Sequence, residues 1–65
     1  MSLETPTQRA YELGMDHAEH DHLGKLHHRL HSGREIAAVM GLTGLDGEQL
    51  VDLRDAYTAG WRDWA

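Results

Sequence analysis

Three helix-start motifs constrain the fold of this chain more than any other feature. In each, a side chain that can cap a helix is followed three residues later by Glu or Gln, so that each side chain can bond the other residue's backbone N–H. The pairs are Thr5 with Gln8, Ser32 with Glu35 and Asp46 with Gln49. Pro6 strengthens the first, because proline suits the first helical position. The motifs predict helices over residues 6–31, 33–40 and 46–64, with Gly41 and Gly44 ending the second.

Apolar spacing indicates how these helices pack. The third predicted helix carries an apolar face with acidic side chains opposite it, and the first carries a broad apolar arc. We expect an all-α, small three-helix domain with long antiparallel first and third helices and a short second helix. Residues 1–5 would be an N-terminal tail and residues 6–65 a single helical domain. The expected core is Leu13, Met15, Leu26, Leu30, Ile36, Val39, Met40, Leu42, Leu50, Leu53, Tyr57, Trp61 and Trp64.

A short repeat joins the two ends of the chain. Residues 10–14 and 56–60 share the pattern Ala-Tyr-x-x-Gly. Small side chains let two helices approach closely, and each tyrosine ring can cover the crossing. The repeat therefore favours a direct contact between the first and third helices.

Length and charge narrow the possible functions. A chain of 65 residues makes one small domain, and the lack of cysteine excludes disulfides and thiolate zinc sites. Eleven acidic against six basic residues give a net charge of −5, which disfavours nucleic acid as a partner. No apolar run approaches the roughly 20 residues of a membrane span, and the N-terminus lacks a signal-peptide pattern. We expect a cytoplasmic protein without a membrane partner.

All six histidines fall between residues 17 and 31. If the first helix runs unbroken to residue 31, five of them share one face and only His22 lies on the apolar arc, where a core position is expected. Spacings of three and four residues suit zinc or nickel, and the candidate metal ligands are His17, His20, Asp21, His27 and His31. Residues 17 and 31 are about 21 Å apart on a straight helix, so each end is a half-site. The alternatives are a solvated polar face and a pH-sensitive contact.

The sequence offers few residues that could carry out catalysis. Ser2 lies in the expected tail, and Ser32 is used for capping. No nucleophile, base and orienting acid can be placed together from spacing. The sequence predicts a protein that is not an enzyme.

Residues 34–43 resemble the first helix and turn of a bacterial helix-turn-helix. The matching positions are Ala37, Gly41, Leu42 and Thr43. The resemblance implies a tight corner after residue 40 and a DNA-binding regulator with Arg34 near the duplex.

The two ends resemble ribosome modulation factor and related small bacterial proteins. The similar pieces are residues 10–14 and 57–62, the second reading Tyr-Thr-Ala-Gly-Trp-Arg. The resemblance implies that the ends of the chain pair as two helices, and members of that family bind the ribosome.

These observations favour a small acidic, non-enzymatic protein-interaction module or regulator, such as a phage or bacterial accessory protein. It would bind a protein partner or form a homo-oligomer. The acidic third helix would meet a basic partner and the aromatic end would add apolar contact, through Asp52, Asp55, Trp61 and Trp64. A histidine-rich protein that binds or senses a transition metal and a helix-turn-helix DNA-binding regulator are the alternatives.

Overall fold

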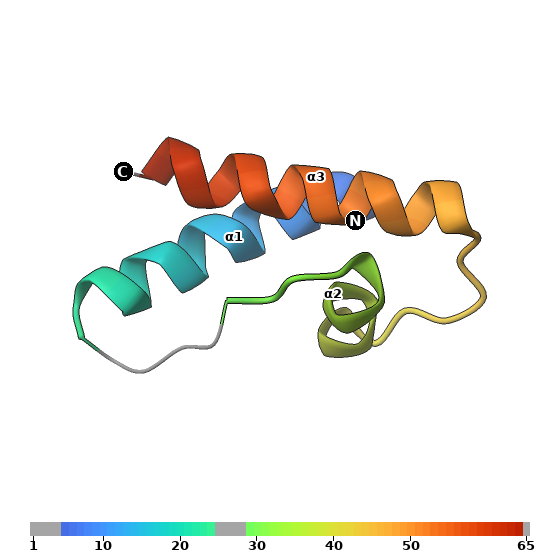
Figure 1. Cartoon of the computed structure of the whole chain (residues 1–65), viewed down its shortest axis with the longest axis horizontal. Helices are drawn as coiled ribbons and strands as arrows, with labels where there is room; N and C mark the ends of the chain where they lie inside the picture. The colour runs from blue at the N-terminus through green and yellow to red at the C-terminus, as the bar shows by residue number, and fades with distance from the viewer. Residues whose placement is uncertain (1–4, 25–28, 65) are drawn as a thin grey trace.

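The described part of the chain folds into three helices. The computed structural model describes residues 5–24 and 29–64. In these ranges α1 spans Pro6–His22, α2 spans Gly33–Met40 and α3 spans Gly47–Trp64, and there is no strand (Figure 1). The prediction of an all-α domain with long first and third helices and a short second helix is confirmed. None of the helices in these ranges is long and apolar enough to cross a membrane.

The three capping motifs start the three helices as predicted. The Gln8 N–H donates to Thr5 Oγ1 at 3.1 Å, and the Glu35 N–H donates to Ser32 Oγ at 3.1 Å. At the third start, the Gln49 N–H donates to Asp46 Oδ1 at 2.8 Å. The Asp46 N–H donates back to Gln49 Oε1 at 3.0 Å. Each bond satisfies a backbone donor that the first turn of a helix leaves without a partner.

The first helix ends earlier than predicted. It stops at His22, where Leu23 caps it and Gly24 has a φ of +75°. Glycine adopts this left-handed conformation without the steric penalty of a Cβ, so Gly24 suits the end of the helix. The expectation of a helix over residues 6–31 is therefore wrong, and His31 does not share a helix with His17 and His20. By contrast, Gly41 ends α2 as predicted, with a φ of +73°.

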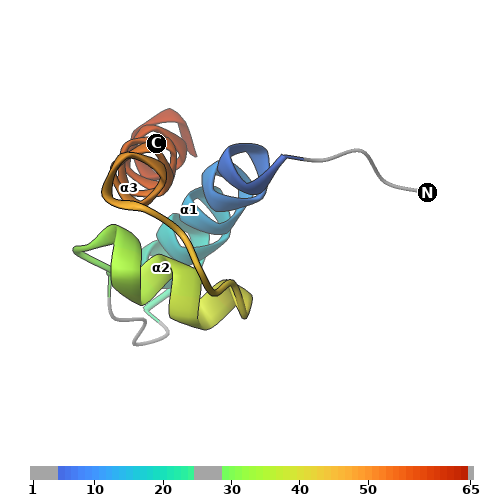
Figure 2. The same ribbon diagram turned by 90° about the vertical axis from the view of Figure 1, so that its right-hand side faces the viewer.

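The antiparallel arrangement of α1 and α3 is also wrong. The starts of the two helices lie together, because Pro6 and Thr7 share a small cavity with Gln49 and Leu53. Their ends also lie together, because the rings of His22 and Trp64 are 5.0 Å apart. Both helices run in the same general direction (Figures 1 and 2). Between them in the chain, α2 packs on the first part of α3, where Gly33 meets the backbone of Leu50.

The repeated Ala-Tyr-x-x-Gly pattern forms the crossing of α1 and α3. A Cβ on Gly14 would collide with the carbonyl oxygen of Tyr57 and lie 3.0 Å from the amide nitrogen of Trp61. A Cβ on Gly60 would collide in the same way with the carbonyl of Tyr11 and lie 3.2 Å from the amide nitrogen of Met15. The structural interpretation of the repeat is confirmed, since each glycine gives the other helix's backbone room to approach.

The core contains residues from all three helices. Its buried members are Ala10, Ile36, Ala37, Leu53 and Tyr57. Most of the other expected core residues are half-buried around them, and Leu26 lies outside the described residues. Val39 is 57% exposed, so its assignment to the core is wrong. Small residues at positions 10, 14 and 18 form the buried stripe of α1. The larger apolar residues of that helix therefore lie at the edge of the core.

Candidate functional site

His17 is a core histidine. Only 7% of it is exposed, and its Nδ1 lies 2.7 Å from the hydroxyl of Tyr57, which is fully buried. The backbone N–H of Leu30 donates to the same hydroxyl at 3.2 Å. A phenol can accept two hydrogen bonds, or accept one and donate one, so this hydroxyl serves both neighbours for either tautomer of His17. The contact joins α1, α3 and the segment that leads into α2.

Burial raises the pKa of Tyr57 above its usual value of 10.0. The N–H of Leu30 and the positive charge of Arg29 oppose this shift by stabilising the phenolate. The guanidinium of Arg29 also lies 5.2 Å from the ring centre of Trp61, which packs beside Tyr57. Burial outweighs these two opposing effects, so the pKa of Tyr57 stays above its usual value.

The predicted metal ligands are not gathered into one cluster within the described ranges. His17 faces the core instead of solvent, whereas Asp21 and His31 are exposed. The Nδ1–H of His20 donates to the carbonyl of Asp16 at 2.8 Å. His27 lies outside the described residues. Within the described part of the chain, no group of three or more His, Asp or Glu side chains could hold a metal ion.

The expectation that His22 is the core histidine is wrong. His22 is exposed and its ring packs against Trp64. The small residues of α1 rotate the buried stripe toward positions 10, 14 and 17, away from the arc on which His22 lies. The sequence prediction placed the large apolar side chains of α1 at the centre of its buried face, and it therefore assigned the wrong histidine to the core.

The four predicted partner-binding residues have two different environments. Asp52 and Asp55 are exposed on the outer side of α3, while Trp61 and Trp64 are half-buried at its end. Tyr11 donates to Asp63 at 2.6 Å on the same part of the molecule. This bond, followed by desolvation and by the carboxylate charge, raises the pKa of Tyr11.

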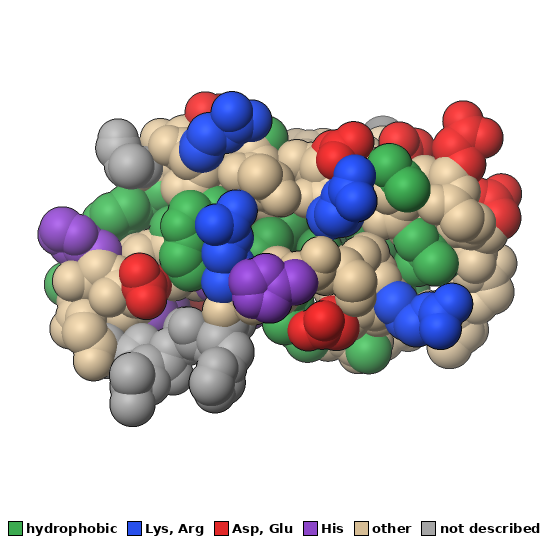
Figure 3. Space-filling view, viewed as in Figure 1, with side chains coloured by type: hydrophobic (Ala, Val, Ile, Leu, Met, Phe, Trp, Pro, Cys, Tyr) green, Lys and Arg blue, Asp and Glu red, His purple; other side chains and the backbone are tan. Residues whose placement is uncertain are grey.

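Charges of opposite sign lie on the two flanks of α3. The acidic flank consists of Glu48, Asp52 and Asp55, all exposed, and Asp52 lies beside the start of α1. The other flank faces α2, where Arg54 shares a groove with His31 and Arg34. Figure 3 shows basic side chains spread over this face with hydrophobic side chains between them. It also shows a row of acidic side chains along the upper right edge, over the first half of α3. The net charge conceals this separation.

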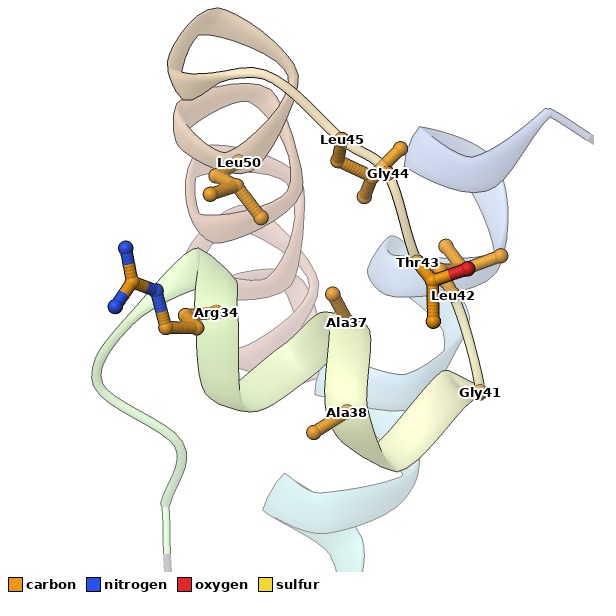
Figure 4. Close-up of a pocket in the computed structure, with 9 residues that line it drawn as sticks. All are labelled: Arg34, Ala37, Ala38, Gly41, Leu42, Thr43, Gly44, Leu45 and Leu50. Carbon is orange, nitrogen blue, oxygen red and sulfur yellow. The ribbon is translucent and has the colours of Figure 1, made fainter.

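The groove beside α3, called here the basic groove, has a volume of about 210 Å³. It is lined by His31, Ser32, Gly33, Arg34, Leu50, Val51 and Arg54. A larger apolar hollow of about 430 Å³ adjoins it, since Arg34 and Leu50 line both. Figure 4 shows Arg34 and Leu50 at one end of this hollow and residues 42–45 at the other.

Sequence reasoning missed the basic groove because its cations come from separate segments. His31 precedes α2, Arg34 lies in its first turn and Arg54 lies in α3. The contact that joins them is the start of α2 on α3, where a Cβ on Gly33 would collide with the backbone of Leu50. Gly33 next to a capping serine was the available signal, but it does not identify the facing helix.

The helix-turn-helix resemblance predicted a tight corner after residue 40. Gly41 caps α2 in the left-handed conformation, and the Leu42 N–H donates to the Ala37 carbonyl at 2.8 Å. Residues 41–46 then separate α2 from α3. This connection is longer than the three- or four-residue turn of helix-turn-helix proteins.

Comparison of the chain with protein-family models, curated proteins and solved structures found no match.

Proposed function

We propose that this chain is a small, non-enzymatic protein-interaction module that acts in the cytoplasm, and that its acidic flank docks on a basic surface of a partner protein. The observation that carries the proposal is the exposed acidic row of Glu48, Asp52 and Asp55 on the outer side of α3. Complementary charge across an interface speeds association and selects the partner.

The packing of α3 supports this proposal. Its opposite side is fixed by the close crossing with α1 and by the burial of Leu53 and Tyr57. An acidic row on a helix held in this way needs little ordering when it binds, which favours affinity. The half-buried rings of Trp61 and Trp64 would add apolar contact at the end of the same helix.

The test compares two variants with the same loss of negative charge. One carries Asp52→Asn and Asp55→Asn on the acidic flank, and the control carries Glu19→Gln and Asp21→Asn on the exposed side of α1. Each immobilised protein is used to capture partners from cell extract, which are quantified by mass spectrometry at low and high salt. We expect the flank variant alone to lose a basic partner, and high salt to weaken capture by the unmodified protein.

Equal loss in both variants would show only a general effect of charge. Undiminished capture by the flank variant would place the interaction elsewhere on the molecule. Either result contradicts the assignment of the acidic flank as the docking surface.

A further inference from the structure

The basic groove and the apolar hollow form one continuous surface with a distinct composition. Ten of the eleven Asp and Glu residues lie in the described ranges, yet none of these ten lines either space. Two arginines and one histidine line the basic groove, and the apolar hollow offers Ala37, Leu42 and Leu45. This surface would therefore favour a ligand that is anionic at one end and aliphatic at the other.

Arg34 is the side chain best placed to meet such an anion. It is exposed, lines both spaces and takes part in neither ion pair found among the described residues. Arg54 is 3.2 Å from the carboxylate of Asp55, in an exposed pair that a ligand could compete with. The carboxylate of Glu35 lies 3.4 Å from Oγ of Ser32, the residue that caps the start of α2.

The floor of the surface is apolar. Val51 is 45% exposed beside the half-buried Leu50, although it lies on a helix whose buried stripe is already covered by α1. An aliphatic side chain bound there would leave water, which contributes binding free energy that a purely ionic contact lacks. Nucleic acid fits this surface less well, because binding to its phosphate backbone needs many cations on one face. The whole chain carries a net charge of −5.

We infer that the basic groove and the apolar hollow bind an acidic peptide segment of a partner protein, with its carboxylates at Arg34 and Arg54 and an aliphatic side chain in the hollow. The site meets the acidic flank on which the proposed function rests only at the ion pair of Arg54 and Asp55, and Arg34 and the hollow lie outside that flank. Together the two would let one small domain contact partners of opposite charge.

The test uses the full chain, isotopically labelled, and a short synthetic peptide in which leucines are flanked by glutamates. Two control peptides replace either the leucines with serine or the glutamates with lysine. We expect saturable changes in the backbone amide resonances of Arg34, Ala38 and Val51 with the first peptide. The serine peptide should bind about tenfold more weakly, and the lysine peptide should not bind at these residues.

Matched variants assign the effect to the groove. Arg34→Glu should weaken the first peptide about tenfold or more, whereas Arg9→Glu makes the same charge change beside Glu12 and Asp16 and should not. Ala38→Glu puts a carboxylate into the hollow one helical turn from Arg34, where it would both repel the peptide and pair with that arginine, so it should also weaken binding. Circular dichroism of each variant checks that the helices are kept.

The inference is overturned if no peptide gives saturable changes, or if Arg34→Glu and Ala38→Glu bind as tightly as the unmodified chain. It is also overturned if a DNA duplex, and not the peptide, binds in an Arg34-dependent way. Self-association abolished by Arg34→Glu would instead identify a second copy as the occupant. Because these variants leave Asp52 and Asp55 intact, their results are independent of the test of the acidic flank.

Discussion

The hydroxyl of Tyr57 meets the imidazole of His17 at 2.7 Å inside the contact between α3 and α1. The contact has an exposed counterpart, in which the hydroxyl of Tyr11 donates to Asp63 at 2.6 Å. His17 follows Tyr11 by the same number of residues as Asp63 follows Tyr57, so each helix supplies one tyrosine and one partner. The two bonds are related by the sequence repeat but differ in burial, which makes them a matched pair for measurement.

Tyr57→Phe should lower the free energy of unfolding by about 1–3 kcal/mol, because it leaves the Leu30 N–H and the buried His17 without the hydroxyl that both contact. Tyr11→Phe should have a much smaller effect, since water can replace the hydroxyl at Asp63. Urea denaturation followed by circular dichroism measures both. Equal losses in the two variants would contradict a structural role for the buried bond.

Stability should fall at alkaline pH because of the two tyrosines. Burial holds the pKa of Tyr57 above its usual value of 10.0, so the folded protein keeps this proton more firmly than the unfolded chain does. The resulting stabilisation is complete below pH 10.0 and is lost as the pH rises through the folded pKa. Denaturation midpoints measured across this range should decline less steeply in Tyr57→Phe. An unchanged decline would assign the effect to Tyr11, whose pKa is raised chiefly by its bond to Asp63.

Gly14→Ala and Gly60→Ala should each destabilise the protein by about 1–3 kcal/mol or more, because the added methyl group meets backbone of the facing helix. Backbone cannot rotate away as a flexible side chain can, so α1 and α3 must separate. Thermal denaturation gives the change, with Gly47→Ala as the control because its Cβ would meet nothing within 4 Å. Normal stability in both crossing variants would show that the helices are not this close.

Local signals predicted the helix starts and the end of α2, because capping depends on side chains within a few residues. Ser32 and Asp46 bond the backbone of residues three positions later, and Gly41 needs no distant partner to adopt its conformation. The repeated Ala-Tyr-x-x-Gly pattern also predicted a contact between two helices, since small residues commonly let helices approach closely where they cross. Fold class and close contact of the ends followed from these features.

Relative direction and the candidate site could not be predicted in the same way. The direction of α3 depends on where Gly24 ends α1 and on how the chain returns through α2. The small stripe of α1 also decides that His17, and not His22, enters the core. The basic groove depends on Gly33 packing against the backbone of Leu50. Nothing in the sequence around either residue indicates that these two positions are in contact.

The end of α1 can be tested with two glycines that differ mainly in backbone conformation. A Cβ on Gly24 and one on Gly47 would both enter open space, but Gly24 has a φ of +75° and Gly47 lies in the first turn of α3. Gly24→Ala should therefore cost about 1 kcal/mol, since an L-residue is strained in the left-handed region. Gly47→Ala should be neutral or stabilise by up to about 1 kcal/mol, because alanine loses less entropy in a helix. Calorimetry and circular dichroism measure both. A Gly24→Ala protein that is more stable and more helical would mean that α1 extends past residue 24 once glycine is removed, which would restore the long first helix predicted from the sequence.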